Sequence, residues 1–205
     1  QRRSAVLSGI LNGIDVDLWN PATDPWIEHR YDAANLHRKT GNKAALQGRC
    51  GLAAAPAASL IGIVSRFTQQ KGLDLVLEAA ERLLRLPAQL VVLGTGEGQL
   101  ERAFLDLARV HPRQVSVTIG FDEPLAHRIE AGADLFVMPS RFEPCGMNQM
   151  YSQRYGTIPV VRATGGLADS VVDCTPATLA DGTASGFLFE TASAPALLAA
   201  IRRAL

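Results

Sequence analysis

The sequence predicts an α/β domain built on a parallel sheet, and three observations support that prediction. From residue 59 onward, short apolar runs alternate with longer amphipathic segments. The apolar runs have the length of buried strands, and the amphipathic segments repeat their apolar residues at helical spacing. Strands and helices that alternate in this way form a sheet covered by helices on both faces. The predicted fold class is therefore α/β, with a Rossmann-like doubly wound parallel sheet.

The predicted elements follow one another in a regular order. The first strand is the apolar run at 60–64, and the helix after it covers 73–86. Pro87 ends that helix, since proline has no N–H with which to continue it. Further strands are expected at 90–93, 115–119, 135–138 and 159–161, and further helices at 99–110, at 124–130, after Gly146, at 167–172 and at 195–205.

The first fifty residues depart from this rhythm. The segment 8–24 is rich in Gly, Asn, Asp and Pro, which is typical of a connector, and a short helix is expected at 42–51. We therefore assign residues 1–20 to an interdomain connector and residues 21–205 to the domain. The chain begins with Gln1 rather than methionine, so we expect that it starts inside a longer protein.

The balance of charge limits the partners that the chain can attract. Twenty Lys and Arg residues match twenty Asp and Glu residues, so the net charge is zero. No overall field then draws the protein to nucleic acid or to an anionic membrane, and an anion has to be bound by a local group of residues. The apolar runs are also much shorter than a membrane-spanning helix requires. We expect neither a nucleic acid nor a membrane as partner.

Cysteine, histidine and aspartate do not form a recognisable metal site in the sequence. The three cysteines are odd in number and lack a CxxC pair, which argues against a disulfide framework and favours a reducing compartment. The four histidines are scattered, and the pair Asp15 and Asp17 lies in the connector rather than after a core strand. We therefore expect no metal and no cofactor. The cysteines are Cys50, Cys145 and Cys174.

The loops after the strands are the places to search for chemistry, because ligands of such sheets bind at the carboxyl ends of the strands. The loop 65–72 carries Arg66 and Lys71 and leads into a helix near Gly72. A helix start offers unpaired N–H groups and a partial positive charge, so two cations beside it favour an anion site. The alternative is that both are solvated surface cations.

The loop 139–149 follows the strand at 135–138 and opens another helix. Its Glu143 carboxylate is suited to accept hydrogen bonds from sugar hydroxyls, while Pro144 stiffens the turn and Gly146 lets the backbone approach a ligand. Glu143 could equally serve only to cap the helix.

Three further loops give weaker signals. Paired glycines at 165–166 suit a close backbone contact, although a tight turn explains them equally well. The turn 94–98 lacks the GxGxxG spacing of a dinucleotide site and is interpreted as a turn near the site. Phe121, after Gly120, follows a strand and could stack on a nucleotide base, whereas most aromatic residues belong to the core.

Four stretches together carry a resemblance to a known family. They are LSGILNGID at 7–15, SRFTQQKGLD at 65–74, SRFEPCG at 140–146 and TGGLAD at 164–169. With them the chain resembles bacterial glycogen synthases and plant starch synthases, which are retaining glucosyltransferases of the two-domain GT-B fold. The resemblance implies that this chain is the C-terminal, donor-binding half, and that the N-terminal acceptor domain is absent from it.

The resemblance implies roles for individual residues. Arg66 and Lys71 would hold the donor diphosphate and Glu143 would contact the transferred glucose, which makes these three the catalytic residues. Phe121 would stack on adenine. Met147 and Asn148 stand where many members have Leu and Thr, and Phe121 where many have Tyr. The implied donor-binding residues are Asn12, Gly120, Phe121, Cys145, Gly146, Met147, Asn148, Thr164, Gly165 and Gly166.

The implied reaction is the transfer of glucose from ADP-glucose to the non-reducing end of an α-1,4-glucan, with retention of configuration and without a metal. The glucan would bind through the absent N-terminal domain. The expected location is the cytoplasm of a bacterium, or the plastid for a plant homologue. We expect the isolated chain to bind ADP or ADP-glucose weakly and to transfer little or no glucose.

Other functions compete with this one. A sucrose-synthase-like retaining enzyme usually has a second glutamate eight residues after the first, where this chain has Tyr151. A dinucleotide-binding oxidoreductase is disfavoured because GxGxxG is missing. A non-catalytic nucleotide-sugar sensor remains open.

Overall fold

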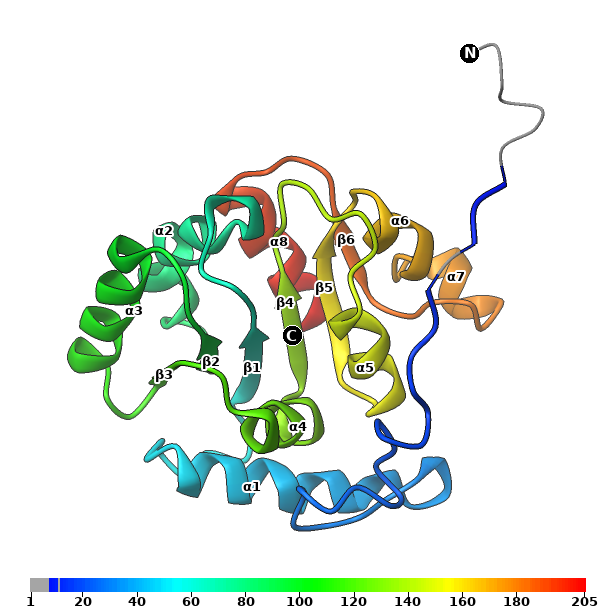
Figure 1. Ribbon diagram of the computed structural model, residues 1–205, viewed down its shortest axis with the longest axis horizontal. Helices are drawn as coiled ribbons and strands as arrows, with labels where there is room; N and C mark the ends of the chain where they lie inside the picture. The colour runs from blue at the N-terminus through cyan, green and yellow to red at the C-terminus, as the bar shows by residue number, and fades with distance from the viewer. Residues whose placement is uncertain (1–7, 11) are drawn as a thin grey trace.

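The structure is a computed structural model that describes residues 8–10 and 12–205, and its centre is one parallel sheet (Figure 1). The strand order is β3-β2-β1-β4-β5-β6, and every neighbouring pair is parallel. The doubly wound sheet that the sequence predicts is therefore confirmed. The strands are β1 (Ser59–Val64), β2 (Ala88–Gly94), β3 (Val115–Ile119), β4 (Leu135–Met138), β5 (Ile158–Arg162) and β6 (Phe187–Phe189).

Helices connect the strands and cover the sheet. The helix predicted at 73–86 ends at Leu83, before Pro87, and the short helix predicted at 42–51 begins earlier, at Lys39. Strand β6 and helix α7 were not predicted. The helices are η2 (Ala33–Arg38), α1 (Lys39–Arg49), η3 (Gln69–Lys71), α2 (Leu73–Leu83), α3 (Gly98–Val110), α4 (Glu123–Gly132), α5 (Asn148–Arg154), α6 (Gly166–Ser170), α7 (Pro176–Ala180) and α8 (Ala194–Ala204).

Alternate residues of β1, β2 and β4 enter two different hydrophobic layers. In β1, Ile61 and Ile63 pack with α2, α3 and α8, whereas Leu60 packs with α1 and α4. In β4, Val137 belongs to the first layer and Phe136 to the second. Because successive side chains of a strand point to opposite faces, a strand buried on both sides is apolar throughout. This explains why the central strands β1 and β4 appear in the sequence as continuous apolar runs.

The strand order reverses between β1 and β4, and this reversal places the functional loops. The chain leaves β1 and β4 at the same edge of the sheet through the loops 65–72 and 139–147. At Gly72, φ is +69°, and a Cβ there would lie 2.1 Å from the carbonyl oxygen of Pro139. The two loops are therefore in direct backbone contact at a position that only glycine can occupy without strain.

The segment before α1 packs on the domain through buried aromatic and polar contacts. The Trp19 ring lies between His127 and Tyr151, with ring centroids 3.9 Å and 3.8 Å away. Below it, the Asp24 carboxylate contacts the Nδ1 of His127 at 2.8 Å and accepts a hydrogen bond from the Tyr155 hydroxyl at 2.6 Å. These contacts fix the end of the segment against α4 and α5.

The amine of Lys39 and the carboxyl group of Glu130 are buried near the C-terminus of α4. The Nζ of Lys39 donates to the carbonyl of Ala131 at 2.7 Å and to the hydroxyl of Thr157 at 2.6 Å, at the C-terminus of that helix. Burial lowers the pKa of Lys39 to about 7. The Glu130 side chain accepts a hydrogen bond from Ser152 at 2.9 Å, and burial raises the pKa of Glu130 to about 8.

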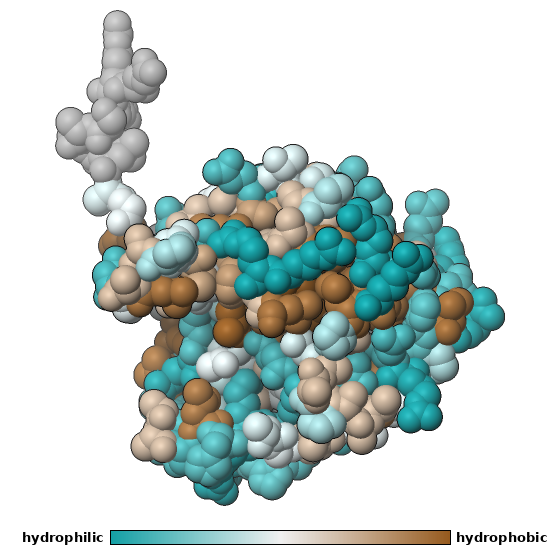
Figure 2. Space-filling model, turned by 180° about the vertical axis from the view of Figure 1, so that it is seen from behind, coloured by the Kyte–Doolittle hydropathy of each residue, from teal (hydrophilic) through white to brown (hydrophobic). Residues whose placement is uncertain are grey.

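None of the described helices combines the length and the apolar character that a membrane crossing demands. Seen from behind, hydrophilic residues cover much of the molecule and hydrophobic atoms gather in a band across its middle (Figure 2). Within 8–10 and 12–205, no three His, Cys, Asp or Glu side chains are grouped to hold a metal, and Asp15 accepts hydrogen bonds from the backbone of Asp17 and Leu18.

Replacing Gly72 by alanine should lower the free energy of unfolding more than the same change at Gly182. Both glycines have positive φ, +69° and +74°, but a Cβ at Gly182 meets nothing within 4 Å. The left-handed conformation alone costs alanine about 1–2 kcal/mol, and the clash with Pro139 should add about 1–3 kcal/mol. Urea unfolding of the two variants measures the difference. Equal losses of unfolding free energy in Gly72→Ala and Gly182→Ala would show that the loops at Gly72 and Pro139 can move apart without cost.

Replacing Glu130 by glutamine should flatten the dependence of stability on pH. Because its pKa is raised to about 8 in the folded chain, the folded state keeps a proton that the unfolded state releases above about pH 4.3. The free energy of unfolding of the unsubstituted chain should therefore fall as pH rises toward 8. Lys39, whose pKa is lowered to about 7, stays mostly protonated between pH 5 and pH 6.5 and contributes little to the change there. Unfolding at pH 5 and pH 6.5 tests this, and an equal loss of unfolding free energy in both proteins would contradict it.

Candidate functional site

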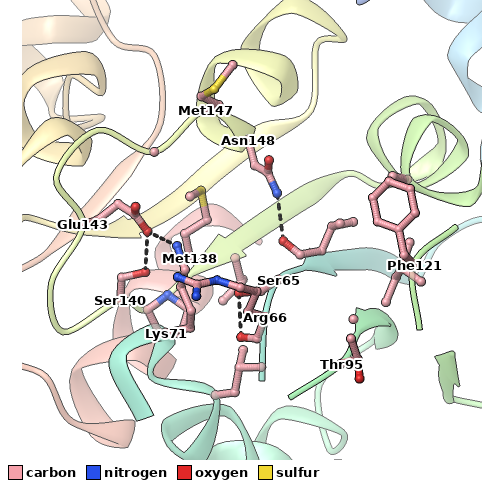
Figure 3. A pocket seen from close by; sticks show the side chains of 18 of the residues that line it. Ser65, Arg66, Lys71, Thr95, Phe121, Met138, Ser140, Glu143, Met147 and Asn148 are labelled. Carbon is pink, nitrogen blue, oxygen red and sulfur yellow. Dashed lines mark hydrogen bonds and ion pairs between the residues drawn. The ribbon is translucent and has the colours of Figure 1, made fainter. Parts of the chain in front are cut away.

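A cavity of about 450 Å³ opens where the loops after β1 and β4 meet (Figure 3). Its walls also include the ends of β2 and β3 and the N-terminus of α5. The cavity thus lies at the carboxyl edge of the sheet, at the reversal of strand order, where the sequence directs the search for a ligand site.

Lys71 and Glu143 form an ion pair across the cavity. Lys71 ends the short helix η3, and Glu143 lies in the loop after β4. The Nζ of Lys71 donates to Oε2 of Glu143, and the Ser140 hydroxyl donates to the same oxygen at 3.2 Å. The two side chains are only 18% and 8% exposed, so each charge depends on the other for compensation. The pair joins the two loops into one unit.

Arg66 is the cation of the cavity without a counter-charge. Among the described residues, no hydrogen bond or ion pair to its guanidinium is found. The other charged residue of the lining, Asp122, accepts a hydrogen bond from the backbone N–H of Leu125 at 2.9 Å and so caps α4. Arg66 therefore offers its five donors to a ligand, in a planar arrangement that can bind two anionic oxygens at once.

An exposed aromatic ring marks the far end of the cavity. Phe121 is 90% exposed and, with Thr95, lies on the other side of the cavity from Glu143 (Figure 3). Thr95 is held in place by a hydrogen bond from its hydroxyl to Glu101 at 2.7 Å. A ring that buries so little of its surface in the protein is available to stack on a flat ligand. Cations and aromatic ring are thus at opposite ends of one cavity.

The side chains of Asn148 and Cys145 donate hydrogen bonds to backbone carbonyls of the protein. The Asn148 amide donates to the carbonyl of Val64 at 2.8 Å and so connects the start of α5 to the end of β1. The Cys145 thiol donates to the carbonyl of Gly146 at 2.9 Å. Asn148 stands where the resembling family often has threonine, and here its side chain braces the cavity wall.

The cavity brings together most of the predicted site residues. Thr164, Gly165 and Gly166 are not in its lining. Instead, the backbone N–H of Gly166 donates to the carbonyl of Glu143 at 3.1 Å, and a Cβ on Gly165 would lie 2.1 Å from that oxygen. These glycines let a neighbouring loop support the Glu143 loop from behind. The predicted residues in the lining are Asn12, Arg66, Lys71, Gly120, Phe121, Glu143, Cys145, Gly146, Met147 and Asn148.

Sequence reasoning missed several residues of the lining. Gly94 and Thr95 belong to a turn that we placed near the site without a contact, and Ser140 and Asp122 were not singled out. Their only sequence signal is position, since each lies at the end of a core strand or shortly after it. Small polar residues are too common in turns for that position alone to distinguish them.

The chain matches a family of glycosyl transferases and is similar to curated bacterial glycogen synthases. The profile of the family described as Glycosyl transferases group 1 matches residues 53–205. The chain is 62% identical over 190 residues to glycogen synthase of Dechloromonas aromatica, covering 93% of this chain and 39% of that protein. It is 56% identical over 203 residues to glycogen synthase 1 of Methylococcus capsulatus, covering 99% and 41%. The chain thus spans about two fifths of the length of these curated relatives.

Solved structures agree with the fold. The catalytic domain of starch synthase IV from Arabidopsis thaliana, bound to ADP and acarbose, superposes with a TM-score of 0.89 at 42% identity, over 96% of this chain and 41% of that one. The Anabaena protein HepE in complex with UDP-glucose reaches 0.67 at 18% identity, over 94% and 46%, which is a likeness of fold alone. The predicted resemblance to bacterial glycogen synthases and plant starch synthases, and the GT-B fold it implies, are confirmed.

The Lys71–Glu143 pair should show strong coupling in a double-mutant cycle. Lys71→Met leaves a nearly buried carboxylate with Ser140 as its remaining side-chain partner, which should lower the free energy of unfolding by about 1–3 kcal/mol. Lys71→Met with Glu143→Gln should lose less than the sum of the two single changes, by about 1 kcal/mol or more. Urea unfolding of the four proteins gives the coupling energy. Additive losses would mean that the pair does not hold the loops together.

Proposed function

The chain belongs to the Glycosyl transferases group 1 family, and on that premise we propose that the protein transfers glucose from ADP-glucose to the non-reducing end of an α-1,4-glucan, with retention of configuration. The observation that carries the proposal is the cavity in which Arg66, Lys71 and Glu143 face an exposed aromatic ring. The similarity to glycogen synthases supports the reaction, and the starch synthase bound to ADP supports the adenine base.

The charges of the cavity suit a diphosphate leaving group. As the bond from glucose to phosphate breaks, negative charge grows on the diphosphate, and fixed cations stabilise that charge without reorganising. Arg66 would bind the phosphate oxygens in its planar fork. Lys71 has three donors, so it can contact a phosphate while it keeps its hydrogen bond to Glu143. The reaction proposed here needs no metal.

The other residues of the lining are suited to the two ends of ADP-glucose, the glucose and the adenine. Glu143 would accept hydrogen bonds from the hydroxyls of the transferred glucose, with Asn12 and backbone groups of the 145–148 segment nearby. Adenine would stack on Phe121, beside Gly120. In this proposal the acceptor glucan binds to a part of the protein outside these 205 residues, and a cytoplasmic location belongs to the same proposal.

The test of this function uses the longer protein that contains this chain. Labelled glucose from ADP-glucose should enter glycogen, and label from UDP-glucose should enter far less. Incorporation with neither donor would overturn the proposal, and calorimetric binding of ADP-glucose without transfer would then support a nucleotide-sugar sensor. This chain alone should bind ADP weakly and transfer little.

Replacing Arg66 by alanine should lower kcat/KM about 100- to 1,000-fold, as expected when one charge-stabilising donor is lost from a transition state. Since the guanidinium has no partner among the described residues, the thermal midpoint should stay within about 2 °C of the unsubstituted protein. Arg82→Ala, an exposed arginine near the other end of α2, is the matched control and should leave kcat/KM unchanged. Equal activity of Arg66→Ala and Arg82→Ala would exclude Arg66 from the site.

A further inference from the structure

An ion pair outside the cavity connects the same two loops that Lys71 and Glu143 join inside it. Asp74, in the first turn of α2, accepts hydrogen bonds from both terminal nitrogens of Arg141, at 2.6 Å and 2.7 Å. Arg141 lies in the loop after β4, two residues before Glu143. The pair is bidentate, which fixes the orientation of both groups as well as their distance. The guanidinium holds the pKa of Asp74 below its usual value, so the pair stays charged at neutral pH.

Backbone hydrogen bonds continue this connection toward Lys71. The same guanidinium donates to the carbonyl of Gln69 at 2.9 Å, and the Arg141 backbone N–H donates to the carbonyl of Gln70 at 2.8 Å. The Gln70 side chain returns a hydrogen bond to the carbonyl of Phe142 at 3.0 Å. Gln69 and Gln70 are the two residues of η3 that precede Lys71. The position of Lys71 is thus tied to the backbone that carries Glu143.

A second arginine holds the other side of the Glu143 loop. Arg162, at the end of β5, donates to the carbonyl of Ser140 at 2.8 Å and to the carbonyl of Arg141. Its remaining nitrogen donates to the carbonyl of Glu190 at 3.0 Å, beyond β6. The loop is therefore fixed to the sheet by Arg162 and to α2 by Arg141. Neither arginine, nor Asp74, lines the cavity.

We propose that Asp74 and Arg141 are positioning residues that set the distance between Lys71 and Glu143 in the glucosyl-transfer step, an inference that rests on the proposed function. The reaction needs the cation on the diphosphate and the carboxylate on the sugar at the same time, and these act from two separate loops. A misplacement of about 1 Å can lower a rate about 100-fold even when it arises outside the reacting groups. Asp74 and Arg141 resist that displacement.

The test replaces Arg141 by lysine in the longer protein that contains this chain. Lysine keeps the positive charge but loses the planar fork, so it cannot hold both oxygens of Asp74 and the carbonyl of Gln69 together. We expect kcat to fall about 10- to 100-fold while the KM for ADP-glucose changes less than about threefold. The thermal midpoint should change by no more than about 4 °C, as expected for a partly exposed ion pair.

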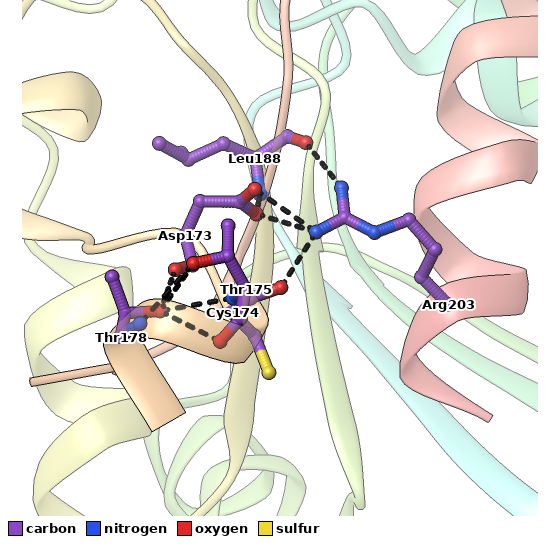
Figure 4. A network of polar contacts seen from close by, with 6 residues as sticks. All are labelled: Asp173, Cys174, Thr175, Thr178, Leu188 and Arg203. Carbon is purple, nitrogen blue, oxygen red and sulfur yellow. Dashed lines mark hydrogen bonds and ion pairs between the residues drawn. The ribbon is translucent and has the colours of Figure 1, made fainter. Parts of the chain in front are cut away.

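The chain offers a matched control in Arg203 (Figure 4). Arg203, on α8, also contacts an aspartate and backbone carbonyls: it donates to Asp173 at 2.9 Å and 3.1 Å and to the carbonyl of Cys174 at 2.8 Å. This network joins α8 to the β6 region and does not line the cavity. One nitrogen of Arg203 makes both contacts to Asp173, but Arg203→Lys is the same substitution in another arginine–aspartate pair and should leave kcat within about twofold of the unsubstituted value.

Hydrogen exchange gives a readout that does not depend on activity. In Arg141→Lys, the backbone amides of residues 69–72 and 141 should exchange faster than in the unsubstituted protein, because the contacts that order them are lost. In Arg203→Lys these amides should not change. Asp74→Asn breaks the same pair from the other side and should reproduce both effects, which keeps the test available if Arg141→Lys does not fold.

Four outcomes decide the inference. A fall in kcat at nearly constant KM with faster exchange at 69–72, absent from Arg203→Lys, supports it. An unchanged kcat in a folded variant overturns it, and so does a loss of kcat that Arg203→Lys shows equally. If the unsubstituted protein transfers no glucose, the proposed function fails and this role in transfer fails with it. The exchange rates then still show whether the pair orders the loop.

Discussion

The reversal of strand order between β1 and β4 is the constraint on which the site depends. Connections on either side of the reversal lead in opposite directions, so the loops after these two strands face each other across a crevice. Lys71 and Glu143 are 72 positions apart in the chain and become neighbours only for this reason. The close approach at Gly72, the Asp74–Arg141 pair and the Arg162 contacts all reinforce the same junction.

The contact between the loops after β1 and β4 buries two opposite charges, those of Lys71 and Glu143. A lysine and a glutamate that are mostly buried destabilise a fold unless each compensates the other. Here the two groups compensate each other within the protein, so both are held in place. Arg66 stands apart, because it has no partner among the described residues and is exposed. All donors of Arg66 are thus available to an anion, whereas Lys71 uses one of its donors to hold the two loops together.

The sequence was sufficient for the sheet but only partly sufficient for the site. Strands β1 to β5 are short segments rich in apolar residues, so their places along the chain and the parallel class of the sheet could be predicted. Strand β6 has three residues and follows a segment rich in Ser, Thr and Gly, where periodicity is too short to measure. Arg66 and Lys71 could be proposed as an anion site from their place after a strand. That Lys71 pairs with Glu143, and that the glycines at 165–166 support the Glu143 loop rather than line the cavity, are consequences of tertiary packing that no local pattern encodes.

The stacking of Trp19 between His127 and Tyr151 has a consequence for whatever precedes it in the chain. Trp19 is fixed on α4 and α5, while Asn12 reaches the cavity wall. A chain extends at most about 3.5 Å per residue, so the residues between them keep Asn12 within about 25 Å of Trp19. The amide of Asn12 is therefore kept near the cavity at an effective concentration on the order of millimolar. Asn12 can then meet a ligand of the cavity with little intrinsic affinity for that ligand.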